Sequence, residues 1–287
     1  SFQRHQRRYG RIRIRKELLG KGIDISEYRI GNILRKNGLK ARSGRTGRPK
    51  KASPSEAQYI EENLIKDKFS VKQPNYLWCS DITEMKCRGT KLYICGVIDV
   101  ATRRLVGWSI AKNQTQKLAQ DAFLMAVGRN PDRPAGAIYH SDRGSQFRAL
   151  RTKELVEGHG FRKSMSRPGT PSDNQPIESF WRTLKCELPD IHSLSFQDAA
   201  RVIVNYIELY YNSERLHSGI KYSVPNQFFT LLKRITQHLQ KFTCSMRNLF
   251  FLHIWILYIK IPSAFSNLFY RNTPSLFVFN SLLPPFF

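Results

Sequence analysis

The sequence Ala137-Ile138-Tyr139-His140-Ser141-Asp142-Arg143-Gly144 places an acid after a short apolar run and just before a glycine. This pattern predicts a strand that ends in a turn, with a carboxylate at its tip. Asp81 has a similar setting in Tyr76-Leu77-Trp78-Cys79-Ser80-Asp81-Ile82-Thr83. We therefore expect two strands of one sheet to carry these two acids.

A third acid, Glu178, opens a helical stretch that has Pro176 in its first turn. Apolar residues recur at helical spacing through this stretch and predict its buried stripe: Ile177, Phe180, Leu184 and Leu188. The same geometry leaves Glu178, Trp181, Arg182 and Lys185 on an adjoining face. The helix is thus expected to present one acid and two basic residues together.

The three acids predict a divalent-metal site if they meet, because hard oxygen ligands suit Mg²⁺ or Mn²⁺ and a phosphate can complete the shell. Each acid also has a purely structural interpretation. The helix dipole alone favours a Glu in the first turn, and an Asp at a strand end is often a turn residue. Only the wider pattern separates these alternatives.

An ordered series of motifs supplies that pattern, and 35 residues lie between Asp142 and Glu178. The series resembles the retroviral-integrase-like core of insertion-sequence transposases, specifically the second-reading-frame product of the DDE type, over most of residues 9–228. The motifs that carry the resemblance are Pro74-Asn75-Tyr76-Leu77-Trp78 before Asp81-Ile82-Thr83, Leu92 to Asp99, Arg103 to Trp108, His140 to Gly144, Ser166-Arg167-Pro168-Gly169, Asp173-Asn174, Glu178-Ser179-Phe180-Trp181 and Leu184-Lys185.

The resemblance implies an α/β protein with a ribonuclease H-like mixed sheet that has helices on both faces. It implies that Asp81, Asp142 and Glu178 are both the catalytic residues and the ligands of two Mg²⁺ or Mn²⁺ ions when DNA is bound. The implied reaction is cleavage at the element's ends, followed by transfer of the freed 3′-hydroxyl to target DNA. The implied partners are double-stranded DNA, further copies of the chain on that DNA, and an upstream-frame helix-turn-helix protein that is fused to it or assists it.

The charge of the chain agrees with a polyanionic partner. The sequence has 47 Lys and Arg against 22 Asp and Glu, which gives a formal net charge of +25. An acidic membrane surface is the competing partner, but no lipidation signal is present and the basic residues are spread along the chain. The five cysteines contain no CxxC pair, which argues against a structural zinc site and favours a reducing compartment. We expect a cytoplasmic protein associated with the nucleoid.

Residues 1–48 predict a small all-α helix-turn-helix module with a basic arm. Gly20-Lys21-Gly22 separates two short helical patterns, and Asp24 or Ser26 can cap the second helix, in which Ile30, Ile33 and Leu34 are expected to be buried. The outward residues expected to contact DNA are Arg29, Asn32, Arg35 and Lys36. A helical hairpin with a solvated basic face is the alternative interpretation. The chain also begins without Met, which suggests a fragment or a frame that continues from upstream.

Residues 49–70 are expected to form a linker and a helix over Ser55–Lys68, and residues 71–230 the catalytic core. Within the core, strands are expected near 76–85, 91–99 and 104–111, then a helix over 115–127, a strand ending at Asp142, a helix near 148–157, a short strand near 161–163 and a helix over 196–211. Short turns between the first three strands predict antiparallel neighbours, and the later helices predict crossovers.

Several core residues have more than one interpretation. The polar loop of residues 164–174 and the closing motif of residues 211–217 are expected to contribute DNA contacts through Arg167, Arg215 and His217, in addition to Trp181, Arg182 and Lys185. Asp99, at a strand end before Thr102, is expected to be a structural turn residue. His140 is expected to be packed or hydrogen-bonded near the acids rather than to bind metal.

Residues 231–287 are expected to be an atypical apolar tail outside the fold, because no acid follows Glu214 and prolines interrupt the stretch. Its longest apolar run, residues 249–259, is about half of the roughly 20 residues that a membrane span needs. Two alternative functions stay open. One is a ribonuclease H-like nuclease without strand transfer, and the other is a decayed, inactive copy that only binds DNA.

Overall fold

The computed structural model describes residues 1–42, 60–65, 69 and 71–238, and the chain divides into two compact units, 1–233 and 234–287. Most of the basic arm and nearly all of the apolar tail therefore lie outside the described residues. The domain boundaries expected from the sequence stay predictions.

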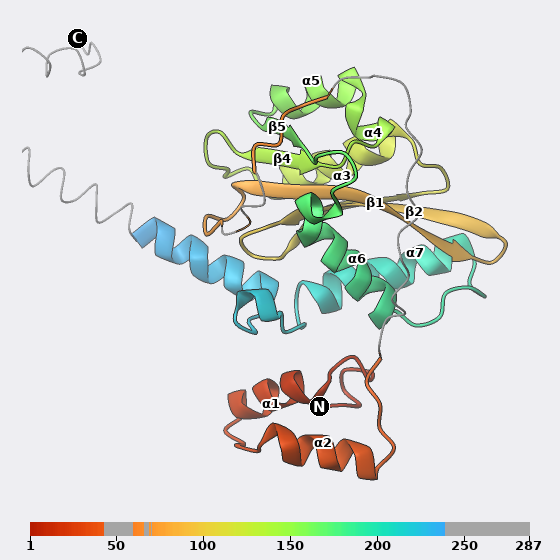
Figure 1. Ribbon diagram of the computed structural model, residues 1–287, viewed down its shortest axis with the longest axis vertical. Helices are drawn as coiled ribbons and strands as arrows, with labels where there is room; N and C mark the ends of the chain where they lie inside the picture. Colours follow the sequence, from red (N-terminus) through yellow and green to blue (C-terminus); the bar gives the residue numbers. More distant parts are fainter. Residues whose placement is uncertain (43–59, 66–68, 70, 239–287) are drawn as a thin grey trace, which may run out of the picture. The chain divides into compact units, whose positions relative to one another are not determined.

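A five-stranded mixed sheet forms the centre of the core (Figure 1). Its strands lie in the order β3-β2-β1-β4-β5; β1 pairs antiparallel with β2 and β2 with β3, whereas β4 pairs parallel with β1 and β5. The strand bounds are Leu77–Cys87 for β1, Thr90–Asp99 for β2, Leu105–Ala111 for β3, Ile138–Ser141 for β4 and Arg162–Met165 for β5. The expected strands and the antiparallel pairing of the first three are confirmed.

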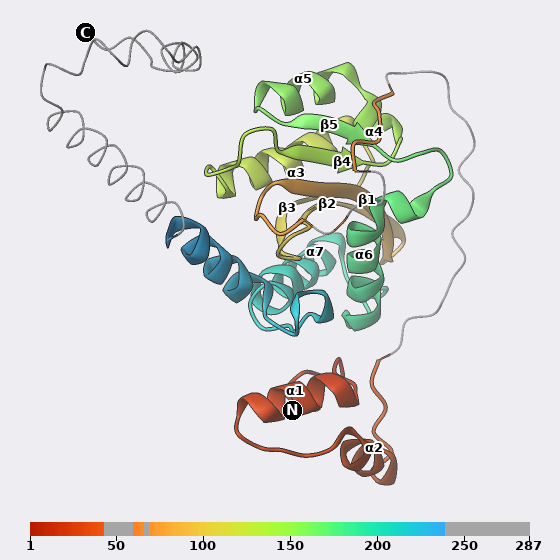
Figure 2. The ribbon, with the colours of Figure 1, turned by 60° about the vertical axis from the view of Figure 1, so that its left-hand side comes forward.

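Helices cover both faces of the sheet (Figure 2). The helices α3, α4 and α5 lie on one face, and α6 and α7 on the other. Their bounds are Gln116–Arg129 for α3, Ser145–Arg148 for α4, Leu150–Gly158 for α5, Gln175–Glu187 for α6 and Phe196–Asn205 for α7, which continues as a π-helical turn, Tyr206–Tyr211. Two 3-10 turns, Pro171–Asn174 and Ser218–Ile220, complete the core elements.

The alternation of β1 explains why the sheet is covered twice. Successive side chains of a strand point to opposite faces. Leu77 and Cys79 belong to the apolar cluster that includes α6 and α7, whereas Trp78 belongs to the cluster that includes α3. The predicted stripe of α6 is confirmed, with Ile177, Phe180, Leu184 and Leu188 all buried. Burial of this apolar stripe fixes α6 against the centre of the sheet, where β1 and β2 pair.

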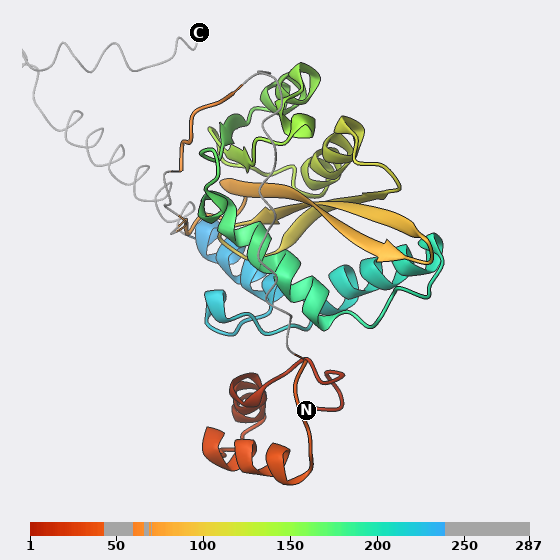
Figure 3. The same cartoon turned by 45° about the vertical axis from the view of Figure 1, so that its right-hand side comes forward.

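The strand order, the crossovers and the two helical layers match the ribonuclease H-like fold implied by the sequence (Figure 3). In this arrangement β1 is the third of five strands and has a neighbour on each side. A residue at the end of β4 is therefore next to β1, although about 60 residues separate the two in the chain. The fold is an α/β ribonuclease H-like sheet, as expected.

The N-terminal residues form two helices, α1 at Arg11–Gly20 and α2 at Glu27–Lys36. Ser26 caps α2, because its side chain accepts a hydrogen bond from the Arg29 N–H at 3.2 Å. Ile14 and Ile30 are buried, but Ile33 is 47% exposed, so its expected burial is wrong. Two ten-residue helices can bury only a narrow seam between them, and Ile33 lies outside it.

The helix expected over Ser55–Lys68 is not present where the structure describes it, because residues 60–65 are not helical. They run beside β5, where the Met165 N–H donates to the Glu62 carbonyl at 3.4 Å and the Leu64 N–H donates to Ser164 Oγ at 3.0 Å. An edge strand exposes backbone groups that need partners, and this demand outweighs the helical pattern of the sequence.

In the part of the chain that the structure describes, no helix is long and apolar enough to cross a membrane.

Candidate active site

The first acid, Asp81, lies on β1 directly opposite Gly96 of β2. It shares the parity of Cys79 and therefore faces α6. One of its carboxylate oxygens, Oδ2, accepts a hydrogen bond from Trp181 Nε1 of α6 at 3.0 Å. Strand β1 thus carries the carboxylate, and helix α6 supplies a hydrogen-bond donor to it.

Asp142 reaches the same edge through the parallel pairing of β1 and β4. Ser80 is the register partner of Ser141, so Asp81 and Asp142 follow neighbouring positions of adjacent strands. The Gly144 N–H donates to Asp142 Oδ1 at 2.9 Å and fixes the carboxylate in the turn before α4. The tip of this turn is where the sequence predicted an acid.

Glu178 lies in the first turn of α6 and is exposed. The start of this helix is tied to β1 because Asn174 Nδ2 donates to the Ser80 carbonyl at 2.9 Å, one residue before Asp81. Pro176 in the first turn suits a helix start, since it lacks the N–H that would have no partner there. Helix α6 therefore begins at the strand that carries Asp81.

The electrostatics of the three acids indicate that they share one site. Burial, followed by repulsion from Asp142, raises the pKa of Asp81 to about 7, and Glu178 adds to this shift. Burial also raises the pKa of Asp142. The pKa of Glu178 is raised by burial and then by Asp142. The structure thus brings the three predicted carboxylates close enough to repel one another, and they accumulate negative charge that a cation can offset.

The residues present fit a divalent cation by their chemistry. Three carboxylates are the hard oxygen donors that Mg²⁺ and Mn²⁺ prefer. A further buried oxygen, Asn174 Oδ1, has no hydrogen-bond partner among the described residues, although the amide nitrogen of the same side chain contacts the strand before Asp81. Within the described ranges, no three His, Cys, Asp or Glu side chains are already gathered as a metal-binding group. Binding would therefore require side-chain adjustment.

Asp99 is a structural acid, as expected. It is fully buried at the end of β2, where it accepts hydrogen bonds from the Asn75 N–H at 3.1 Å and the Thr102 N–H at 3.2 Å. The Thr102 hydroxyl donates a third. Three donors hold this carboxylate in the turn between β2 and β3, so it is fixed without a cation.

His140, next to the acids in sequence, is hydrogen-bonded as expected. It is fully buried between Ser164 Oγ at 2.8 Å and Ser166 Oγ at 3.1 Å. Burial lowers its pKa to about 4, so the imidazole is neutral at pH 7. The two hydroxyls occupy both ring nitrogens, and His140 links β4 to β5.

The predicted DNA-contacting residues are found in different settings. Exposed basic side chains on α2 and α6 are free to face a phosphate backbone: Arg29, Arg35, Lys36, Arg182 and Lys185. Asn32 is half-buried and accepts from Arg35 Nη1 at 3.2 Å. Arg167 is exposed, but its Nη2 contacts the buried Asp173 carboxylate at 2.7 Å. For Arg167, a positioning role competes with direct DNA contact.

Two of the expected DNA contacts need correction. Trp181 is 5% exposed, so its ring packs between α6 and the sheet and cannot stack on a base. Arg215 is 3% exposed and forms a two-pronged ion pair with Glu187, with Nη2 to Oε1 at 2.7 Å. Burial and the nearby arginines lower the pKa of His217 to about 3, which leaves this half-buried ring without charge at pH 7. Apolar packing holds Trp181 and an ion pair holds Arg215 inside the fold, whereas His217 stays a predicted DNA contact.

Two residues that shape the site have no role predicted from the sequence. Asn174 was noted only within a motif, yet it joins α6 to β1. Gly96 lies in the middle of the apolar strand β2, and a glycine there signals that another group approaches the backbone closely. That signal was present in the sequence, but the partner could not be named without the fold.

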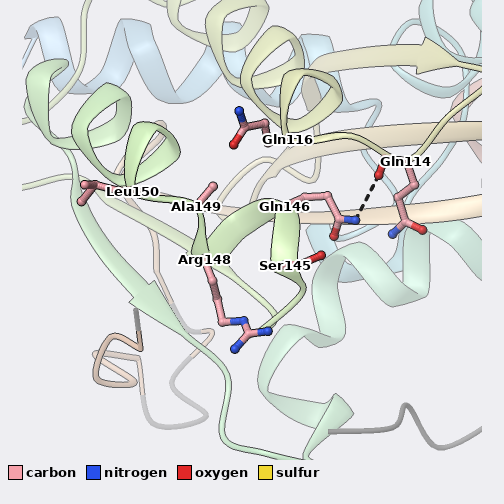
Figure 4. A pocket seen from close by; sticks show the side chains of 7 residues that line it. All are labelled: Gln114, Gln116, Ser145, Gln146, Arg148, Ala149 and Leu150. Atoms are coloured by element: carbon pink, nitrogen blue, oxygen red, sulfur yellow. Dashed lines mark hydrogen bonds between the residues drawn. The ribbon is translucent and has the colours of Figure 1, made fainter. Parts of the chain in front are cut away.

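A hollow of about 600 Å³ lies beside the turn that carries Asp142, mainly over α4 (Figure 4). Three of its seven lining residues are glutamines, and Gln146 Nε2 donates to the Gln114 carbonyl at 3.1 Å. The lining residues are Gln114, Gln116, Ser145, Gln146, Arg148, Ala149 and Leu150. No Asp or Glu is among these lining residues, so the hollow lacks the negative charge of the neighbouring carboxylates.

Comparisons with known proteins agree with this geometry. Models described as integrase core domain match residues 71–171 and 159–225, and an HTH-like domain matches residues 1–46. The chain is 39% identical over 228 residues to the transposase for insertion sequence element IS904 of Lactococcus lactis, covering 79% of this chain and 89% of the relative. It is 34% identical over 229 residues to transposase InsF for insertion sequence IS3A of Escherichia coli, covering 79% of each.

Solved structures that resemble the chain include the HTLV-2 integrase catalytic core domain in complex with magnesium, with 19% identity and a TM-score of 0.40 over 54% of this chain and 96% of that one. Another is the simian T-cell lymphotropic virus intasome in complex with a PP2A regulatory subunit, with 18% identity and a TM-score of 0.42 over 71% of this chain and 66% of that one.

Proposed function

Because the chain belongs to the family of insertion-sequence transposases with an integrase core, we propose that it cuts DNA at the ends of an insertion sequence and joins the freed strands to target DNA. The catalytic residues of this proposal are Asp81, Asp142 and Glu178. The enzyme is a polynucleotidyl transferase, and the reaction is DNA transposition.

The observation that carries the assignment of these residues is their convergence: the β1–β4 register places Asp81 beside Asp142, and the Asn174 hydrogen bond to Ser80 ties the start of the Glu178 helix to β1. Asp81 from β1, Asp142 from the turn after β4 and Glu178 from α6 are far apart in sequence, yet each has a raised pKa to which burial contributes. Neutral contacts hold two of them, the indole N–H of Trp181 and the backbone N–H of Gly144. Among the described residues no ion pair reaches these three carboxylates, although the Arg148 charge opposes the rise in the pKa of Asp142.

The three carboxylates would hold Mg²⁺ or Mn²⁺, two ions when DNA is bound. These ions supply Lewis-acid stabilisation of phosphoryl oxygens and lower the pKa of bound water. The chain's own contribution is placement. Gly144 orients Asp142, Trp181 orients Asp81, and Asn174 ties the start of α6 to β1. No protein nucleophile is needed, so one site can serve both hydrolysis and joining.

Double-stranded DNA is the proposed substrate, and the exposed basic residues of α2 are the proposed readers of the element's ends. Arg29, Arg35 and Lys36 lie on a capped helix, and the net charge of +25 favours binding that weakens with salt. Assembly of several copies on DNA, help from an upstream-frame helix-turn-helix protein, and work in the cytoplasm at the nucleoid complete the proposal.

The test uses a duplex that carries the inverted repeat flanking the gene, and a second, pre-cut duplex for joining. Asp81→Asn, Asp142→Asn and Glu178→Gln each remove a ligand charge while nearly preserving shape. Each variant should lose both Mg²⁺-dependent reactions by more than the roughly 10–100-fold that loss of a supporting residue costs at metal sites. DNA affinity should stay equal or rise, because a negative charge is removed. Single-turnover rates and filter binding measure the two effects.

Asp99→Asn is the matched control, because it alters a buried acid of the same sheet outside the cluster. Cleavage and joining should persist in its folded fraction. Full activity in folded Glu178→Gln protein, or none in folded Asp99→Asn protein, would refute the assignment. Cleavage without joining by the unaltered chain would favour the ribonuclease H-like nuclease instead, and DNA binding without either reaction would favour the inactive copy.

A further inference from the structure

We infer that Trp181 is a positioning residue for the Asp81 carboxylate, and that position 96 is glycine so that the indole can reach it. This inference rests on the proposed function, since it concerns how one catalytic acid is held. The starting observation is the β1–β2 register, in which Asp81 and Gly96 are direct partners. Directly opposed residues of an antiparallel pair place their side chains on the same face, a few ångströms apart. The space beside Asp81 would therefore normally hold the side chain of residue 96.

The indole of Trp181 fills that space. A Cβ atom added at Gly96 would lie 2.8 Å from Trp181 Cη2 and 3.0 Å from Cζ2, which is closer than carbon atoms approach one another. Trp181 is 5% exposed, and its Nε1 donates to Asp81 Oδ2 at 3.0 Å. The position of the Trp181 ring thus accounts both for the glycine at position 96 and for the hydrogen bond to Asp81.

The chemistry of the donor suits a carboxylate that must stay charged and available. An indole N–H is a neutral donor, so it orients Asp81 without cancelling its charge. An arginine or lysine in the same place would form an ion pair and compete with a bound cation. Asp142 and Glu178 both repel Asp81, and the Trp181 hydrogen bond opposes this repulsion because it stabilises the ionised carboxylate. Trp181 holds the carboxylate against that repulsion.

Trp108 offers a matched comparison, because it also donates an indole N–H to a carboxylate on the same side of the sheet. Its Nε1 contacts Glu208 Oε1 at 2.6 Å. That carboxylate is also paired with Arg129, at 2.6 Å, and lies outside the three-acid cluster. Replacement of either tryptophan by Phe removes one indole donor and a similar apolar volume. Only the loss at position 181 should affect the cluster.

The experiment compares full-length Trp181→Phe, Trp108→Phe and Gly96→Ala proteins with the unaltered chain. Three quantities are measured: affinity for the end duplex without metal, the rise in melting temperature on addition of Mn²⁺ without DNA, and the Mg²⁺ concentration for half-maximal cleavage. Trp181→Phe should weaken the Mn²⁺ effect and raise the Mg²⁺ requirement about 10-fold or more, within the range that supporting residues of metal sites show. DNA affinity should stay within about twofold, and Trp108→Phe should match the unaltered chain in all metal-dependent readouts.

Gly96→Ala gives a second and independent route to the same displacement. With Trp181 present, the added methyl group should push the ring and reproduce the loss of metal affinity. In Trp181→Phe protein the same change should add little, because Phe lacks Cη2 and Cζ2. A Gly96→Ala/Trp181→Phe protein no worse than Trp181→Phe supports the inference.

Unchanged metal dependence in Trp181→Phe, or in Gly96→Ala, overturns the inference. Equal losses from Gly96→Ala in the Trp and Phe backgrounds overturn the claim that the glycine serves the indole. Asp81→Asn, assayed beside these variants, separates the two levels of the proposal. If Asp81→Asn remains active, the proposed site itself is wrong. If Asp81→Asn is inactive and Trp181→Phe normal, only the positioning role fails.

Discussion

Helix α6 has a glutamate near each end, and the two side chains lie in opposite environments. At the first turn, Glu178 reaches the surface, and partial loss of water around its carboxylate and then the Asp142 charge raise its pKa. At the last turn, Glu187 is buried and receives Arg215 Nε at 2.9 Å, Arg215 Nη2 at 2.7 Å and the Tyr206 hydroxyl at 2.8 Å. Among the described residues, Glu178 has no ion pair, although the chain carries 47 Lys and Arg.

Under the proposed function, this contrast separates acids that hold the fold together from acids that bind a cation. A buried charge is tolerated in a native structure when it is paired and hydrogen-bonded. Glu187 meets that condition entirely from within the chain. The cluster of Asp81, Asp142 and Glu178 does not, since no ion pair to these carboxylates is found among the described residues and Asp81 is repelled by the other two. A cation supplied from outside is the remaining way to meet it.

The largest stability effect is expected at the paired end of the helix. Arg215→Met leaves Glu187 buried with the Tyr206 hydroxyl and the more distant Arg13 Nη1 at 4.0 Å, and it should lower the free energy of unfolding by about 3–5 kcal/mol. Chemical denaturation of the full chain measures the change. Glu178→Gln, at the other end of the same helix, should change it by less than about 0.5 kcal/mol.

A double variant sharpens that result. Glu187→Leu combined with Arg215→Met removes both charges, so it should recover much of the lost stability. Loss of stability in the double variant as large as in Arg215→Met would mean that packing, not charge pairing, makes Arg215 important.

The next effect extends the comparison to the sheet, where Asp99 and Asp81 lie on paired strands. The carboxylate of Asp99 accepts hydrogen bonds from Asn75 and Thr102, and Asp99→Asn replaces one of its oxygens with an amide nitrogen that is itself a donor. The change should therefore cost about 1–3 kcal/mol of stability. Asp81→Asn relieves repulsion and should leave the metal-free protein equally stable or more stable. Thermal melts of both variants without divalent metal decide this. A destabilised Asp81→Asn protein would place Asp81 among the structural acids.

The smallest effect concerns pH and a third paired acid, Glu17 of α1. It contacts Lys21 Nζ at 2.8 Å, and the hydrogen bonds from Lys21 and Ser1 outweigh partial burial and lower its pKa to about 2. A pKa below the usual 4.5 means that the ionised form stabilises the folded state. This contribution is fully present above pH 4.5 and is lost as the pH falls towards 2.

Glu17→Gln should therefore melt earlier than the unaltered chain at pH 7, by an amount equivalent to about 1 kcal/mol, and the difference should shrink as the pH falls from 4.5 towards 2. Melting curves across that range test the sign. A difference that grows on acidification would show that Glu17 is not stabilised by its partners.

Much of the architecture could be predicted from the sequence, because local patterns fix local structure. The short turns between the strands expected near 76–85, 91–99 and 104–111 predicted antiparallel neighbours, and the spacing of Ile177, Phe180, Leu184 and Leu188 predicted the buried stripe of α6. Period 2 and period 3.6 are properties of the backbone, so they are legible in a single chain. The resemblance, carried by ordered motifs, then identified the three acids.

Other roles depended on partners far away in the sequence, and only the tertiary structure decided them. Arg215 and Trp181 look like surface DNA contacts in the sequence, but the fold buries them against Glu187 and Asp81, which lie 28 and 100 residues away. The helical pattern of residues 60–65 gave way to the demand of the β5 edge for backbone partners.

Gly96 shows the same division at one position. The sequence shows a glycine inside an apolar strand. Such a glycine signals that another group approaches the backbone closely. The identity of this group, the indole of Trp181, follows only from the fold. The strand register and the packing of α6 bring together Gly96 and Trp181, which are 85 positions apart. A local pattern specifies where the backbone leaves space, whereas the fold determines what fills it.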